Sequence, residues 1–158
     1  MRLKRSLPRN HVLLVALLIG LAGCNPFGVS EEDELADAEK LWERSNIRDY
    51  SFEMRTSCFC PPEIIEWARV TVQNRAIVSV TSLTGTPLSG NARDSRKTVD
   101  QLFAAVKPPY PDWVDRVDFN FDPQYGYPVS LRLESRKDVL DAGIIYEARN
   151  LQPFIAVD

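Results

Sequence analysis

The sequence predicts an α+β domain in which an antiparallel sheet of about six strands carries two helices on one face. Three observations lead to this prediction. Two segments place apolar residues three and four positions apart, and each is followed by three segments in which apolar and polar residues alternate. Most connections between these alternating segments are short enough for antiparallel pairing, and two helices can cover only one face of such a sheet.

The first helix is expected to begin after Ser30 and to run to about Arg48. Ser30 carries a hydroxyl that can cap a helix, and three acids follow it in the first turn, where the helix dipole favours negative charge. One stripe of this helix is expected to face the core, because residues three and four apart lie on the same side. The stripe consists of Leu35, Ala38, Leu41, Trp42 and Ser45.

Three strands are expected between residues 50 and 83. The first starts at Tyr50 and ends at Cys58-Phe59-Cys60-Pro61-Pro62, because consecutive prolines cannot donate hydrogen bonds to a neighbouring strand. Apolar and polar residues also alternate in the segments 67–72 and 76–83, which we expect to be the second and third strands. Asn74 lies between these two segments and tolerates left-handed backbone, so the sequence predicts a hairpin there.

The second half of the chain repeats this order. Residues 84–97 are rich in Gly and short polar residues and are expected to form a long exposed loop. A helix, Val99–Val106, is expected to begin after a cap at Thr98 and to end before the prolines that follow. Alternation then predicts strands at 114–121, 129–133 and 144–151, and we expect the turn at 122–128 to be structural.

The amino terminus predicts export and lipidation. A basic head is followed by the apolar run 12–21 and then by Leu21-Ala22-Gly23-Cys24, which is the order of regions in a secretory signal peptide. A cysteine directly after Leu-Ala-Gly resembles the lipobox of bacterial lipoproteins. That resemblance implies that residues 1–23 are removed and that Cys24 is acylated. The alternative is an ordinary signal peptide that happens to carry a cysteine.

The expected organisation is then a signal peptide (1–23), a lipidated tether (24–30) and a single globular domain (31–158). Two or more acyl chains anchor a protein stably, so we expect the membrane to be a partner through the lipid. The domain is expected to face the periplasm or another extracytoplasmic side of a bacterial cell envelope. Without the signal, 15 Lys and Arg stand against 22 acids, a net charge of −7, which argues against binding nucleic acid.

Cys58 and Cys60 are the two remaining cysteines, and three interpretations of them are open. Disulfides persist in oxidising compartments, but Cα atoms two residues apart on a regular strand lie about 6.5–7 Å apart, so a bond needs an irregular backbone at Phe59. A redox-active dithiol usually has two residues between its cysteines and lies at a helix start. A zinc site needs further ligands, and the only histidine, His11, lies in the signal peptide.

Catalytic groups are scarce in the mature chain. Because no histidine is left after removal of the signal, a Ser-His-Asp or Cys-His arrangement is excluded. Residues 118–122 begin like a calcium loop, but Pro123 replaces the required Gly and Val129 stands where the bidentate Glu belongs. We therefore expect no metal, no cofactor and, on balance, no enzyme.

Several motifs together resemble a family of bacterial lipoproteins classed only as a domain of unknown function. They are the lipobox, Trp42 ahead of Asp49-Tyr50-Ser51-Phe52, Ser57-Cys58-Phe59-Cys60-Pro61, Val99-Asp100-Gln101-Leu102-Phe103, and Phe121-Asp122-Pro123-Gln124-Tyr125-Gly126-Tyr127-Pro128. The matching blocks lie between about residues 40 and 151. The resemblance implies a single secreted domain and brings no activity with it.

Four aromatic residues lie in proline-rich or turn segments: Tyr110, Trp113, Tyr125 and Tyr127. Such rings either fill the core or form a binding surface, and Tyr and Trp are enriched at interfaces. The expected function is a non-catalytic binding or accessory module at the envelope, which contacts an envelope protein or another envelope component. Its contact surface would be the uncovered sheet face or these aromatic segments. The alternatives are a thiol-disulfide redox protein that uses Cys58 and Cys60 and, third, a carboxylate-based enzyme.

Overall fold

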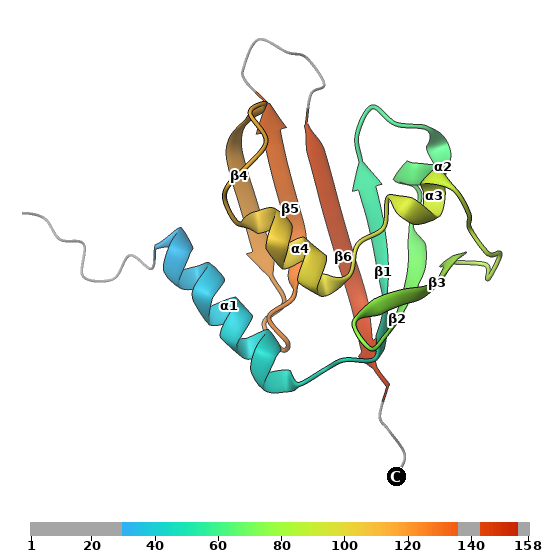
Figure 1. The fold of residues 1–158 in the computed structure, drawn as a ribbon, viewed down its shortest axis with the longest axis horizontal. Coiled ribbons are helices and arrows are strands. Elements are labelled where there is room, and N and C mark those ends of the chain that lie inside the picture. The colour runs from blue at the N-terminus through green and yellow to red at the C-terminus, as the bar shows by residue number, and fades with distance from the viewer. Residues whose placement is uncertain (1–29, 136–142, 155–158) are drawn as a thin grey trace, which may run out of the picture.

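A computed structural model describes residues 30–135 and 143–154, so the predicted signal peptide and Cys24 lie outside the described residues. A six-stranded antiparallel sheet with the order β3-β2-β1-β6-β5-β4 organises the domain (Figure 1). The strands are β1 (Tyr50–Ser57), β2 (Ala68–Gln73), β3 (Ala76–Ser82), β4 (Val114–Phe121), β5 (Pro128–Ser135) and β6 (Ile144–Pro153). The predicted α+β class and the alternation of the strands are confirmed.

The first and last strands of the chain form the central pair of the sheet. β1 to β3 form one meander and β4 to β6 another, and β1 and β6 join the two meanders. Met54 pairs with Ala148, and both side chains are buried on the same face of the sheet. This central pairing connects residues that are between 88 and 103 positions apart, so no local sequence pattern could predict it.

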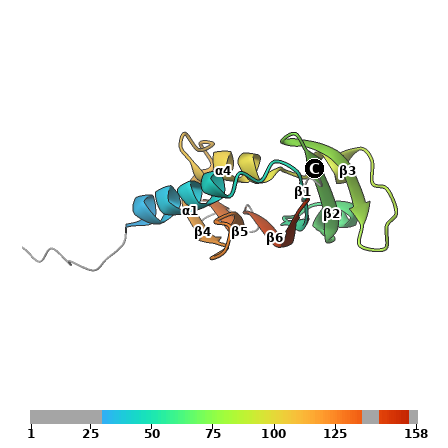
Figure 2. The same ribbon diagram turned by 90° about the horizontal axis from the view of Figure 1, so that it is seen from below.

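Two helices cover that face, α1 (Glu31–Ser45) and α4 (Val99–Val106), as Figure 2 shows. The hydroxyl of Ser30 accepts a hydrogen bond from the backbone N–H of Asp33, and Thr98 forms a capping box with Gln101. α1 ends three residues before the expected Arg48. It ends there because Asn46 adopts left-handed backbone at φ 49° and its N–H bonds the carbonyl of Glu43.

The core lies between these helices and the sheet. Phe52 and Met54 of β1 are almost completely buried there. The hydroxyl of Tyr50 accepts a hydrogen bond of 2.9 Å from the backbone N–H of Val99, at the start of α4. The indole of Trp42 on α1 donates to a carboxylate oxygen of Asp100, also on α4, at 3.1 Å. One strand and two helices are therefore joined by specific polar contacts as well as by apolar packing.

The predicted loop 84–97 is partly wrong. It contains a short helix, α3 (Asn91–Asp94), and Arg96 is only 3% exposed. The guanidinium of Arg96 donates to four backbone carbonyls, those of Ala92, Met54, Glu63 and Glu66. Glu63 lies in the second unpredicted helix, α2 (Pro62–Ile65), and Glu66 directly follows that helix. Backbone carbonyls, and not acidic side chains, accept the hydrogen bonds of this buried guanidinium. The composition of the segment could not reveal such an arginine.

Candidate functional site

Cys58 and Cys60 are joined by a disulfide directly after β1. Their Cα atoms are 5.2 Å apart, well inside the range for a disulfide and shorter than the spacing on a regular strand. The backbone irregularity that the sequence required for a bond is therefore present, and both cysteines are half-buried. The covalent bond ties the backbone on both sides of the residue between them.

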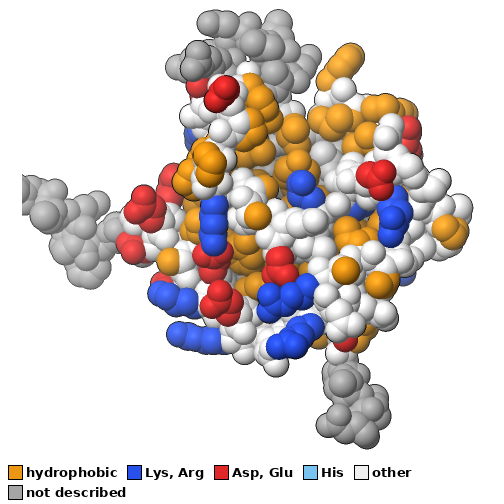
Figure 3. Space-filling model, viewed as in Figure 1, with side chains coloured by type: hydrophobic (Ala, Val, Ile, Leu, Met, Phe, Trp, Pro, Cys, Tyr) orange, Lys and Arg blue, Asp and Glu red, His pale blue; other side chains and the backbone are white. Residues whose placement is uncertain are grey.

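That residue, Phe59, is 94% exposed, the highest value among the large hydrophobic residues that the structure describes as exposed. Pro61 and Pro62 follow it and are exposed as well, and Ile65 at the end of α2 is 39% exposed. Figure 3 shows apolar side chains gathered at the upper end of the molecule, over the end of β1 and around α2. The disulfide thus presents an aromatic ring to solvent next to further apolar surface.

The four aromatic residues singled out in the sequence do not form one surface. Tyr127 is 3% exposed and packs in the core, so the expectation that it offers a contact surface is wrong; burial also raises the pKa of its hydroxyl. Tyr125 is half-buried against the same core. The hydroxyl of Tyr110 donates to the carbonyl of Val106, which fixes its ring at the end of α4. Only Trp113, at 39%, counts among the exposed large hydrophobic residues.

The face of the sheet opposite α1 and α4 carries charged side chains around Trp67. Successive side chains of a strand point to opposite faces, so the neighbours of buried Met54 and Ala148 project from this side. The guanidinium of Arg149 lies 3.9 Å from the centroid of the Trp67 ring, and that of Arg55 lies 5.0 Å from it. Two strands thus each supply a cation to one indole ring.

Each of these two cations pairs with a carboxylate of the neighbouring strand. Glu147 on β6 accepts two hydrogen bonds from Arg55, at 2.6 and 3.0 Å, and these bonds lower the pKa of the Glu147 carboxyl despite its partial burial. The carboxylate of Glu53 on β1 accepts a hydrogen bond of 2.8 Å from Arg149. It also forms an ion pair with Arg69 on β2, with 3.6 Å between nitrogen and oxygen. Burial raises the pKa of Glu53, but the bonds from Arg149, Asn150 and Arg69 outweigh it and the pKa is lowered. We call these six residues the Trp67 platform: Trp67, Arg55, Arg149, Glu53, Glu147 and Arg69.

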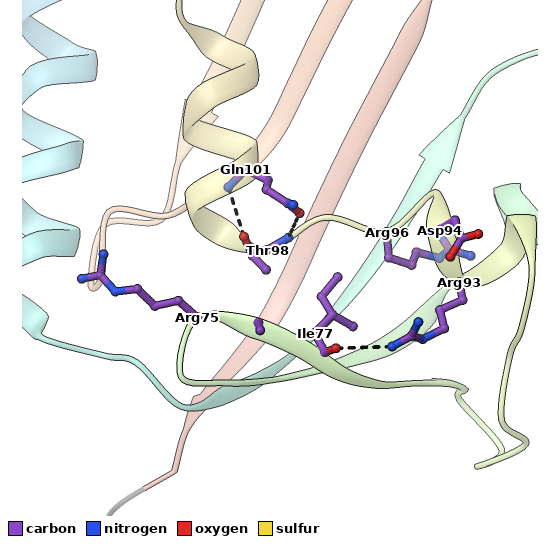
Figure 4. A pocket seen from close by; sticks show the side chains of 8 residues that line it. Arg75, Ile77, Arg93, Asp94, Arg96, Thr98 and Gln101 are labelled. Atoms are coloured by element: carbon purple, nitrogen blue, oxygen red, sulfur yellow. Dashed lines mark hydrogen bonds between the residues drawn. The ribbon is translucent and has the colours of Figure 1, made fainter.

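A hollow of about 390 Å³ lies between β3, α3 and the start of α4, and three arginines line it. Figure 4 shows that Arg75, Arg93 and Arg96 point in different directions. Arg93 is directed at the carbonyl of Ile77, 3.4 Å away, and Arg96 is occupied by its four carbonyls. The guanidinium groups therefore do not converge on a common point, as they would at a preformed anion site.

Neither metal-binding clusters nor membrane-spanning helices are found within residues 30–135 and 143–154. No three His, Cys, Asp or Glu side chains in these ranges lie close enough together to hold a metal ion. No helix in the same ranges is long and apolar enough to cross a bilayer. Within this part of the chain, the disulfide-bonded loop and the Trp67 platform are the two features that we consider as functional candidates. Sequence reasoning missed the platform because its members come together only once the strand order is known.

Comparison with known proteins gives one match. A family described as "Family of unknown function (DUF6174)" matches residues 34–153, which include all ten helices and strands except the first three residues of α1. No curated protein matches the chain, and no solved structure does. The family match confirms the resemblance to a domain of unknown function and brings no activity with it.

Proposed function

The chain belongs to this family of unknown function, DUF6174, and we propose that it is a lipid-anchored lipoprotein of the bacterial cell envelope whose domain acts as a non-catalytic binding module. The lipobox that ends at Cys24 supports the anchor, and the Cys58–Cys60 disulfide fits an oxidising, extracytoplasmic compartment. The Trp67 platform is the observation that carries the binding role.

The Trp67 platform has the properties of a preorganised contact surface. Stacking on Trp67 and pairing with Glu53 and Glu147 restrict the arginine side chains before any partner arrives. Binding to an ordered surface loses less side-chain entropy than binding to mobile side chains, and Trp and Arg are enriched among residues that dominate binding energy. The platform presents both signs of charge, so its partner is an envelope protein with a polar surface of mixed charge.

A photo-crosslinking amino acid on the uncovered sheet face tests the binding role. Arg132 on β5 lies on this face, because it pairs with Ile145 beside Glu147, and its side chain is 49% exposed. Lys40 on α1, 57% exposed, provides the control position on the opposite side. In the intact envelope we expect a discrete crosslinked product from position 132 and none from position 40. Equal crosslinking from both positions, or none from 132, would contradict a binding role for this face.

The second candidate function, thiol-disulfide exchange, rests on the position of the Cys58–Cys60 bond. The bond lies in a surface loop beside the exposed Phe59, and accessible disulfides are the more easily reduced ones. Reduction in a series of glutathione buffers separates the two proposals. A bond that stays oxidised under strongly reducing buffers is structural, whereas a bond that opens in the range of known dithiol oxidoreductases would favour the redox protein.

A further inference from the structure

Phe59, Ile65 and Trp113 are exposed large hydrophobic residues that lie at one end of the sheet. Phe59 and Ile65 follow β1 and precede β2, whereas Trp113 directly precedes β4. The register brings these positions to the same end. Ser57 pairs with Ile145 at the start of β6, β6 in turn pairs with the end of β5, and Val114 pairs with Ser135 (Figure 1).

This apolar end, defined as Phe59, Ile65 and Trp113, is broad and held in shape. Three strand spacings separate β1 from β4, so Phe59 and Trp113 lie on the order of 15 Å apart across the sheet. The disulfide holds Phe59, and exposed prolines stand beside it and beside Trp113. Figure 3 shows apolar side chains on both sides of this end. A rigid, solvent-exposed aromatic surface of this kind marks an interaction site.

We propose that the apolar end lies in the interfacial region of the lipid bilayer to which the chain is anchored, a proposal that rests on the lipid anchor proposed above. The position at which the lipidated segment joins the domain supports the bilayer as the partner of this end. Leu35, in the second turn of α1, packs against the cluster of Val106, Leu131 and Leu133, and Val114, which directly follows Trp113, packs against the same cluster.

The length of the tether keeps the start of α1 close to the bilayer. The segment from Cys24 to Ser30 spans at most about 20 Å, so a lipid on Cys24 keeps the start of α1 within that distance of the membrane. Such a tether raises the effective concentration of lipid at the apolar end, so that weak insertion of a few side chains is sufficient. Trp and Phe are the residues that favour the interface between headgroups and acyl chains.

Charge defines the kind of membrane surface. Among the described residues of this end, Glu63 and Glu66 stand beside Ile65, and Asp112 stands beside Trp113, and these acids disfavour an anionic surface. The lipid that fits is therefore zwitterionic. In this orientation the strands stand roughly upright on the membrane, and the Trp67 platform faces sideways, open to a partner.

Quenching of tryptophan fluorescence by brominated phosphatidylcholine tests the proposal in vesicles that carry the acylated full-length protein. Phe59→Trp places a reporter at the apolar end. Phe154→Trp is the matched control, because Phe154 is also exposed, at 44%, but follows β6 at the opposite end of the sheet. We expect the Phe59→Trp variant to be quenched by brominated lipid beyond the parent, the new indole adding to Trp113, and the Phe154→Trp variant to be quenched no more than the parent. Trp113→Phe should lose most of the quenching seen in the parent.

The outcomes separate this inference from the anchor. Protein that fails to float with the vesicles overturns the lipid anchor itself. Protein that floats but shows equal quenching for the two reporters, or none, overturns the membrane-facing end while the anchor stands. Quenching that appears only when phosphatidylglycerol is added would contradict the zwitterionic preference that the acids of this end predict.

Discussion

Gly126 lies directly against the backbone of Ala38: a Cβ atom placed on Gly126 would be 2.3 Å from the Ala38 carbonyl oxygen. Gly126 has a φ of +79°, and its N–H donates to the carbonyl of Asp122 at 2.8 Å. The carboxylate of Asp122 accepts the backbone N–H groups of Gln124 and Tyr125 and so closes the turn. The turn 122–128 is therefore the surface on which the middle of α1 rests, as the sequence predicted in assigning it a structural role.

Substitution of Gly126 by Val should lower the melting temperature strongly. The left-handed backbone costs an L-residue about 1–2 kcal/mol, and the collision with Ala38 forces α1 away for a further loss of similar size. Together these effects predict a fall of roughly 10 °C or more. Gly85→Val is the control, because Gly85 also has positive φ (+94°) but no atom within 4 Å of its Cβ position. Equal melting of the two variants would show that contact with α1 is unimportant.

Substitution of Tyr50 by Phe should destabilise the domain and change its response to alkali. The variant leaves the buried N–H of Val99 without its acceptor, a loss of about 1–3 kcal/mol in the free energy of unfolding in urea. Burial raises the pKa of the Tyr50 hydroxyl, as it does for Tyr110, Tyr127 and Tyr146.

Because the native state holds these protons more tightly than the unfolded chain, the stabilisation is complete below the ordinary tyrosine pKa of about 10 and is lost as pH rises beyond it. Urea unfolding at a series of pH values above 9 should therefore show a falling free energy of unfolding. The slope of the free energy of unfolding against pH reports how many protons are released on unfolding. In Tyr50→Phe this slope should be smaller, by the equivalent of up to one proton. An unchanged slope would mean that Tyr50 ionises as readily in the native state as in the unfolded chain.

Substitution of Arg96 by Ala should unfold the region around α2 and α3 at lower urea concentration. The guanidinium of Arg96 donates to carbonyls of β1, of α3, of α2 and of the residue that follows α2, so one buried side chain joins these three elements. Leaving several buried carbonyls unpaired predicts a loss of roughly 3 kcal/mol. The neighbouring Arg93→Ala removes a single exposed bond of 3.4 Å and should change stability by only a few tenths of a kcal/mol. A comparable loss in both variants would count against this role of Arg96.

Limited proteolysis should cut first between residues 84 and 90. The sequence alone predicted a cut anywhere in 84–97, but α3 and Arg96 protect the second half of that segment. Gly85 and Gly90 lie in open space, and the residues between them are mostly exposed. Mass spectrometry of the first fragments identifies the site. A first cut within 91–97 would show that the buried contacts of Arg96 are not maintained in solution.

The local patterns of the chain predicted its strands well because a half-buried strand must alternate. The strand 114–121 begins and ends where alternation does, and Asn74 forms the expected hairpin with φ 48°. The features that the sequence did not predict depend on contacts between distant segments. Helices of four residues such as α2 and α3 have no periodic stripe. The members of the Trp67 platform come from three strands and from the residue before β2, and the sequence does not state the order of these strands.

For the candidate site, the sequence identified Cys58 and Cys60, because few cysteines remained, but not the exposure of the ring between them. For Tyr127 the sequence left two alternatives open, the core or a binding surface, and the fold selects the core. Exposure of an aromatic ring depends on what packs over it, and this information comes from the fold.

The most direct test of the account is metabolic labelling of the full-length protein with a radioactive or clickable fatty acid, together with membrane fractionation, for the wild type and Cys24→Ala. The account predicts that label and processing are present in the wild type and absent in Cys24→Ala, and that the variant leaves the salt-resistant membrane fraction or accumulates as an unprocessed precursor. A Cys24→Ala protein that is labelled, processed and retained at the membrane like the wild type would contradict the lipid anchor and the function built on it.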